Sequence, residues 1–421
     1  MRAKDLVHSN QIFALIAKGL EGSKAAIISV IIARSYSAHD LGIFSYVLAV
    51  GAIIAIIAEF RLHSVVVREL NTGTIPKNEV LGSAISAISF FALIGIALIG
   101  AISFYEKDTT TSIGLAIFGI SYILKIPRPF KSYYTAQSKN SVNAKCEIVS
   151  STITLAITLY LAINNYDLIW IIATRVGDFF IGSLLLSLTY YLDEKKGLKC
   201  SWSTVRSLTG QSAPLVLSGA AMLLFQRLDL VFVKNILGTS EAGYYTAAIT
   251  VMSLFSIPPM VISESLAPKL FKSGSEASKQ QFCNILFFLG FSLSLCMLLT
   301  SLFAIDLIFG EDYKAAILPA TILSASPLLI ALGASAGQII VFERTQHLAL
   351  IKCIIACIVS VMLNIILIPT LKLAGAATAT VAGLFIANYI SHLFIPAYRH
   401  IFKAQNNSVF IAFRSIRGSN K

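Results

Sequence analysis

The sequence predicts an all-α polytopic membrane protein with about 12 transmembrane helices, in two six-helix lobes related by a pseudo-twofold along the membrane normal. Three observations predict this class. Of the 421 residues, 56% are hydrophobic and only 13% are charged, which leaves more apolar surface than a soluble protein of this size can bury. Stretches of about 20 mainly apolar residues, the length of a spanning helix, recur along the chain. A short motif of the first half also returns in the second half.

Windowed hydropathy predicts where the spans lie. They are expected near residues 11–33, 43–66, 80–104, 113–135, 145–163, 168–190, 211–235, 243–266, 281–304, 315–342, 347–369 and 374–397. The fourth span is the weakest, because Pro127 and Pro129 interrupt it and its end is amphipathic. The start of the chain has some features of a signal peptide, but charged residues interrupt its apolar core, so the first span is expected to be retained.

The basic residues alternate from loop to loop. With a cytoplasmic N-terminus, most Lys and Arg fall on the cytoplasmic side, among them Lys125, Arg128 and Lys131 at the end of the fourth span. The opposite loops are richer in acids, which is the pattern of the positive-inside rule. The formal charge of +12 is therefore explained by a membrane topology with both termini cytoplasmic. Nucleic acid is not expected as a partner, because no basic face or motif of a folded soluble domain is visible.

An internal repeat predicts how the chain divides into domains. Residues 39–46 (HDLGIFSY) open the second span, and residues 240–247 (SEAGYYTA) open the eighth. An even number of spans separates the two segments, so the halves are expected to share one orientation and to form a site between them. The predicted domains are an N-terminal lobe, a C-terminal lobe and a basic cytoplasmic tail that is partly disordered or lies on the anionic inner leaflet, at 1–200, 201–398 and 399–421.

Charged residues inside the predicted spans indicate a polar cavity. A Lys, Arg or Asp at the centre of a spanning helix costs about 2.5–3.5 kcal/mol, so most of these residues must face water, protein or one another. They concentrate in spans 1, 2, 6, 7 and 8, and none lies in the interiors of spans 9–12. The candidate substrate and cavity residues are Lys18, Glu21, Lys24, Arg61, Arg175, Asp178, Arg227 and Asp229.

The deepest of these residues are cations. Lys18, Glu21 and Lys24 recur every three residues and therefore lie on one side of the first helix. Lys18, Lys24 and Arg227 suit an anionic ligand, because cations in a medium of low dielectric constant attract phosphate strongly. Arg227 and Asp229 do not share a helix face, so each is expected to have a partner elsewhere.

For the other candidates a purely structural interpretation is open. Arg175 and Asp178 stand three residues apart and can pair, so they could equally be an ion pair that holds helices together. Arg61, like Glu59 and Glu264, lies near the cytoplasmic end of its span, where a long side chain can reach the membrane surface.

No motif for catalysis or metal binding is present. The sequence has no GxxxxGK[ST], HExxH or GxSxG, so neither an ATPase nor a hydrolase is predicted. No enzyme activity, cofactor or metal site is expected. The six cysteines, including Cys353 and Cys357 on one helix face, are interpreted as small buried apolar residues.

Several short motifs resemble a known family. They are residues 33–46 (ARSYSAHDLGIFSY), 68–70 (REL), 226–230 (QRLDL), 242–248 (AGYYTAA), 265–270 (SLAPKL), 309–313 (FGEDY), Asn364 and 373–377 (LAGAA). With these motifs the whole chain resembles the Wzx-type O-antigen and polysaccharide flippases of the multidrug/oligosaccharidyl-lipid/polysaccharide superfamily. Residues 59–61 (EFR) depart from the family's pattern late in the second span.

The resemblance implies a fold, a substrate and partners. It implies two lobes around a V-shaped cationic cavity that opens to each side of the bacterial inner membrane in turn, with ion antiport. The substrate would be an undecaprenyl-pyrophosphate-linked oligosaccharide, moved from the inner to the outer leaflet. Membrane lipids and the O-antigen polymerase machinery would be further partners.

Two other functions are consistent with the sequence. A multidrug or cation antiporter of the same superfamily should have an acid-rich cavity, whereas the basic residues here at least balance the acids. A non-transport scaffold or polymerase of glycan assembly is the third possibility, but a polymerase is expected to carry a long periplasmic loop, and no predicted connection is that long. The flippase is therefore favoured.

Overall fold

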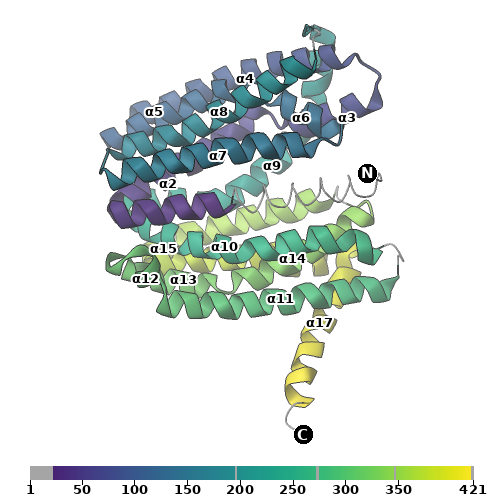
Figure 1. Cartoon of the computed structure of the whole chain (residues 1–421). Coiled ribbons are helices and arrows are strands. Elements are labelled where there is room, and N and C mark those ends of the chain that lie inside the picture. The colour runs from purple at the N-terminus through teal and green to yellow at the C-terminus, as the bar shows by residue number, and fades with distance from the viewer. Residues whose placement is uncertain (1–21, 195–196, 272–274, 346–347, 419–421) are drawn as a thin grey trace. The chain divides into compact units, whose positions relative to one another are not determined.

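The structure, a computed structural model, describes residues 22–194, 197–271, 275–345 and 348–418 (Figure 1). Helices make up nearly all of these residues, and no strand occurs among them. This confirms the predicted all-α membrane fold. The chain forms two compact units, one of residues up to Tyr36 with Ile43–Leu223, and one of Ser37–Gly42 with Leu224 onwards. The boundaries between these units fall inside two helices, after Gly42 and after Leu223. The predicted lobes were instead divided between spans, and their boundaries stay a prediction.

The first unit is a bundle of long antiparallel helices. Within it α4 packs on α5, α5 on α8, and α8 on α7, as Figure 1 shows. Its elements are a helix over residues 22–35, α2 (Ala38–Glu59) from Ile43 onwards, α3 (Leu62–Thr72), α4 (Lys77–Tyr105), α5 (Thr109–Leu124), α6 (Pro129–Ala136), α7 (Asn140–Ile163), α8 (Leu168–Asp193) and the first part of α9 (Trp202–Leu237). Many side chains that point away from this bundle are large and apolar, such as Phe90 and Leu93, as expected for helices that face lipid.

The second unit is also helical. Here α11 packs on α14, and α10 packs on both. Its elements after α9 are α10 (Thr239–Leu270), α11 (Glu276–Phe303), α12 (Ile305–Phe309), η2 (Glu311–Ala316), α13 (Ile317–Leu323), α14 (Ser326–Phe342), α15 (Ala349–Phe385), η4 (Ile386–Ile390), α16 (Ser391–Phe394), η5 (Pro396–Tyr398) and α17 (Arg399–Gly418).

The helices account for the predicted spans. Among the described residues, seven helices are long and apolar enough to cross a membrane, or up to ten if each of three bent pairs is one span. One of the seven, Ala349–Phe394, has 46 residues, and a straight helix of that length would measure about 69 Å, twice the hydrocarbon core. It turns at Lys372, whose φ is 51°, and a Cβ on Gly375 would overlap the carbonyl of Leu367. It therefore holds the last two predicted spans, and the first predicted span lies partly outside the described residues.

Two spans of the first unit are broken. The second predicted span is interrupted between α2 and α3 by Phe60 and Arg61, whose φ angles of 45° and 44° are left-handed. The fourth is a pair, α5 and α6, bent by 46°. Prolines at 127 and 129 explain the second break, because proline lacks the amide hydrogen that a continuous helix needs. The first break contains neither Gly nor Pro, so tertiary contacts must hold it.

The predicted basic tail is a helix over most of its length. In α17, Ile401 and Gln405 are fully buried, and Ser408 donates a hydrogen bond to Asn284 of α11 at 2.7 Å. The amide of Gln280 on α11 donates to the carbonyl of Ala404 at 2.9 Å. The beginning of this segment is therefore ordered and part of the second unit, and the expected cytoplasmic tail, partly disordered or on the inner leaflet, stays a prediction.

The two copies of the repeat motif contact each other reciprocally. Within the second unit, a Cβ on Gly42 would overlap the carbonyl oxygen of Thr239, and a Cβ on Gly243 would overlap the carbonyl oxygen of Ala38. Each glycine therefore rests on the residue that opens the other helix. Contacts of i with j and of the equivalent j with i are typical of a twofold relation. This geometry supports the internal repeat and explains why both copies have glycine.

We expect Gly42→Ala and Gly243→Ala each to destabilise the protein by about 1–3 kcal/mol, because the added methyl group meets backbone that cannot move aside. The measurement is the melting temperature of the purified protein in detergent. Gly100→Ala is the matched control: nothing lies within 4 Å of its Cβ position in α4, and alanine favours a helix. Equal melting temperatures for all three variants would contradict the close contact.

Candidate functional site

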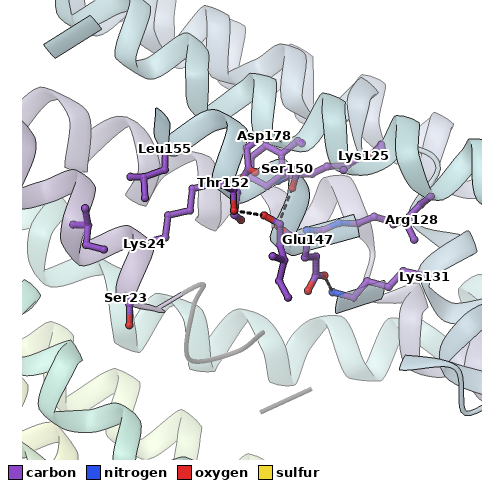
Figure 2. A pocket seen from close by; sticks show the side chains of 17 residues that line it. Ser23, Lys24, Lys125, Arg128, Lys131, Glu147, Ser150, Thr152, Leu155 and Asp178 are labelled. Atoms are coloured by element: carbon purple, nitrogen blue, oxygen red, sulfur yellow. Dashed lines mark hydrogen bonds and ion pairs between the residues drawn. The ribbon is translucent and has the colours of Figure 1, made fainter. Parts of the chain in front are cut away.

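A cavity of about 200 Å³ lies within the first unit, between the helix over residues 22–35, the break between α5 and α6, and helices α7 and α8 (Figure 2). Four cations and two carboxylates line it, together with serine and threonine hydroxyls and apolar side chains. The charged residues are Lys24, Lys125, Arg128, Lys131, Glu147 and Asp178. We call this the first cavity.

One end of the first cavity is a buried charge cluster around Asp178. The Lys24 side chain is only 4% exposed, and its Nζ lies 2.8 Å from Asp178 Oδ2. Arg175 Nη1 lies 3.2 Å from the same oxygen. Lys24 also donates a hydrogen bond to Thr154 Oγ1 at 2.9 Å. Two cations thus share one carboxylate, and a hydroxyl also accepts from the buried ammonium, because a charge away from water needs such partners.

The other end is a cluster at the helix breaks. Glu59, the last residue of α2, accepts from both Lys125, at 3.2 Å, and Arg128. The buried Lys125 ammonium also lies 4.0 Å from the centroid of the Phe179 ring, a cation–π contact that further compensates for the loss of water. Lys131 pairs with Glu147 across the cavity, and both side chains are more than a third exposed.

Basic residues outnumber acids across the two clusters. Five cations meet three carboxylates: Lys24, Lys125, Arg128, Lys131 and Arg175 against Glu59, Glu147 and Asp178. Each acid is already engaged, and the side chains of Arg128 and Lys131 are partly exposed. An anion can therefore bind here without displacing every ion pair, whereas a cation would meet net repulsion.

A second cavity of about 250 Å³ adjoins the first. Lys125, Arg128 and Lys131 line both cavities, and the second adds Arg61 and His63 at the break between α2 and α3. His63 Nδ1 lies 2.7 Å from Ser132 Oγ. In the part of the chain that the structure describes, Arg61 has no ion-pair partner.

The structure brings three of the predicted residues together. Lys24, Arg175 and Asp178 form one cluster, which confirms the predicted pairing of Arg175 with Asp178. Arg61 lies apart from them, at the second cavity. Lys18 and Glu21 lie outside the described residues.

The remaining two candidates belong to the second unit. Asp229 is 4% exposed and accepts hydrogen bonds from Tyr245 Oη at 2.9 Å and Thr380 Oγ1 at 3.1 Å. The prediction that Asp229 has partners elsewhere is thus confirmed. Arg227 is exposed. Both residues stay predictions as substrate ligands.

Sequence reasoning missed half of the site. The loop charges predict Lys125, Arg128 and Lys131 only as positive-inside residues of the cytoplasmic side, and this gives no sign that they line a cavity. Their spacing of three residues is the same as that of Lys18, Glu21 and Lys24 and is the available signal that the three side chains lie on one side of the chain, although the helix breaks between Leu124 and Pro129. Nothing comparable identifies Glu147, because no basic residue stands three or four residues from it on α7.

Comparisons with known proteins place the chain in a family. Residues 31–318 match the family described as polysaccharide biosynthesis protein. A relative is the capsular polysaccharide biosynthesis protein CapF of Staphylococcus aureus, 22% identical over 404 residues that cover 93% of this chain and 98% of CapF. Another is the probable low-salt glycan biosynthesis flippase Agl15 of Haloferax volcanii, 23% identical over 373 residues, with coverage of 86% and 77%.

Solved structures agree on the fold. The lipid II flippase MurJ, in an inward closed conformation, superposes with a TM-score of 0.74 at 15% identity, and the match covers 96% of this chain and 91% of MurJ. The family match spans well over half of the chain, so this protein belongs to the family of polysaccharide biosynthesis proteins. This confirms the resemblance to polysaccharide flippases of the superfamily named above.

We expect Asp178→Asn to destabilise the protein strongly, by about 3–5 kcal/mol, because it leaves the buried Lys24 and the largely buried Arg175 without their carboxylate. Glu147→Gln, which breaks a half-exposed pair, should cost no more than about 1 kcal/mol. Thermal unfolding of the two purified variants measures the difference. A cost for Asp178→Asn as small as that for Glu147→Gln would show that the cluster around Asp178 is hydrated rather than buried.

Proposed function

We propose that the protein is a flippase that translocates undecaprenyl-pyrophosphate-linked O-antigen or polysaccharide repeat units from the inner to the outer leaflet of the bacterial inner membrane. It works by alternating access through a cationic central cavity. The observation that carries the proposal is the excess of cations over carboxylates around the first cavity, in a chain of this family. Both termini lie in the cytoplasm in the proposed topology, as the loop charges suggest.

The chemistry of the first cavity supports an anionic lipid-linked substrate. A pyrophosphate presents several oxygens that accept charge-assisted hydrogen bonds, and Lys and Arg are the side chains that supply them. Arg128 and Lys131 are 43% and 39% exposed, so they can turn toward a ligand. Apolar lining residues such as Ile27 and Leu155 provide a surface for an isoprenoid chain. Glu59 and Glu147 hold the cations in place between transport cycles.

The relatives support the same class of substrate. Agl15 is described as a probable glycan biosynthesis flippase, and MurJ as a lipid II flippase. Substrates of this kind join a polar glycan to a lipid, so a path for them needs polar groups inside the protein and access from the bilayer. Membrane lipids and the polymerase that receives the repeat unit are the partners that the proposal implies.

A multidrug or cation antiporter is the second candidate, because the superfamily includes such transporters. The charge around the first cavity argues against it, since a cationic drug would be repelled by the excess of Lys and Arg. A scaffold without transport is the third candidate. Charged side chains inside a membrane protein cost free energy, and a scaffold would gain no function from them.

The test is complementation of a bacterial strain from which the polysaccharide flippase has been deleted, scored by surface polysaccharide. The protein should restore the polysaccharide, and Lys24→Ala and Lys131→Ala should reduce it at least about tenfold, the effect of losing one charge-assisted contact. We expect the same of Lys18→Ala and Arg227→Ala, the other deep cations predicted from the sequence.

Lys139→Ala is the matched control, because this exposed lysine lies in the same unit but lines neither cavity. Protein levels in the membrane must be equal for all variants. Normal polysaccharide from every cavity variant would exclude the cationic cavity as the transport path. Resistance to cationic drugs in place of polysaccharide would instead favour the antiporter.

A further inference from the structure

The second cavity has a stronger charge imbalance than the first. Four cations, Arg61, Lys125, Arg128 and Lys131, line it against the single carboxylate of Glu59. Glu59 is already shared by Lys125 and Arg128, and Lys131 pairs with Glu147, which does not line this cavity. The cavity is therefore left with positive charge that no described acid neutralises.

Both broken spans restart at this cavity. Leu62 is the first residue of α3 and Pro129 the first of α6, and both residues line the cavity. Neither helix start is capped by a side chain. The positive ends of two helix dipoles thus add to the charge of the four side chains. Broken helices whose second halves begin at a cavity are a recurrent way to bind anionic groups inside membranes.

The four cations are not equivalent. Lys125 is buried, bound to Glu59 and placed over Phe179, so its role is to stabilise the fold. Arg128 uses one guanidinium nitrogen for Glu59 and keeps further donors. The Arg61 side chain lies against Gly219 of α9, where an added Cβ would overlap it. Its left-handed backbone turns the chain at the cavity, although no glycine is present to make that conformation easy.

We propose that the second cavity is a phosphate-binding site in which Arg61 and Arg128 bind the diphosphate of the lipid-linked substrate. Building on the proposed function, it is the site that the substrate reaches first from the inner leaflet, before the first cavity. Lys125, Arg128 and Lys131 line both cavities. The diphosphate can therefore pass from one cavity to the other while it stays in contact with basic side chains. Anionic phospholipid carries the same phosphate chemistry, so the experiment must separate the two sources.

The experiment measures binding of undecaprenyl diphosphate to the purified full chain in nanodiscs of phosphatidylcholine. Arg128→Gln and Arg61→Gly should each weaken binding by at least about tenfold, and inorganic pyrophosphate should compete. Arg61→Gly removes the charge but relaxes the left-handed backbone, so its melting temperature should not fall. Loss of binding by this variant cannot then be attributed to misfolding. Arg206→Gln, at an exposed arginine of α9 outside both cavities, should bind within about twofold of the wild type.

Three results would overturn the proposal. The first is binding of undecaprenyl diphosphate by Arg61→Gly and Arg128→Gln at wild-type affinity. The second is loss of phosphatidylglycerol binding alone, in nanodiscs that contain it, because the cavity would then serve bulk phospholipid. The third is weakening by Arg206→Gln to the same extent, which would indicate nonspecific attraction. If both arginine variants bind at wild-type affinity while the wild type complements the flippase deletion, only the proposal of the phosphate site is rejected. A wild type that neither binds nor complements removes the proposed function as well.

Discussion

The cost of placing a charge away from water shapes the first unit. Each buried cation there has a carboxylate, a hydroxyl or an aromatic ring beside it, and each carboxylate in the interior serves one or two cations. Several of these partners come from different helices, so their contacts also hold those helices together at that depth. Glu59 connects the end of α2 to the segment between α5 and α6, and Asp178 connects α8 to the helix over residues 22–35.

The helix breaks and the ion pairs depend on each other. A left-handed backbone at two residues that are not glycine is unfavourable by about 1–3 kcal/mol each, so Phe60 and Arg61 need contacts that compensate. Glu59 directly before them is held by two cations, and the Phe60 ring stacks on Phe91 of α4 at 3.9 Å between centroids. The same break leaves a space lined by Arg61. One local departure from helical geometry therefore both ends α2 and opens a cavity lined by a basic side chain.

Much of the fold could be predicted from the sequence because lipid imposes simple rules. Runs of about 20 apolar residues must be helices, since the backbone has no other way to satisfy its hydrogen bonds in a bilayer. Prolines 127 and 129 indicated the weak fourth span, which is bent. The last two predicted spans, 347–369 and 374–397, likewise separate where the chain turns at Lys372. The break at Phe60 and Arg61 had no such signal, because it contains neither Gly nor Pro.

The site could be predicted only in part, for a related reason. The i, i+3 spacing of Arg175 and Asp178 was readable along one helix, whereas the contact of Lys24 with Asp178 joins residues of two helices, and one sequence does not say which helices are adjacent. Lys125, Arg128 and Lys131 were explained by topology, so their second role went unnoticed. The positive-inside rule explains why these residues are basic, but it does not predict that their side chains line a cavity.

The reciprocal seating of Gly42 and Gly243 bears on how such a chain can evolve. If the two halves arose by duplication, the ancestral single half would have made this contact with a second copy of itself, and one mutation would have changed both sides at once. In the fused chain the two glycines are encoded separately, but each still packs against the start of the helix that carries the other. Neither glycine is then free to drift alone, and the pair preserves a trace of the ancestral dimer after the surrounding sequences have diverged.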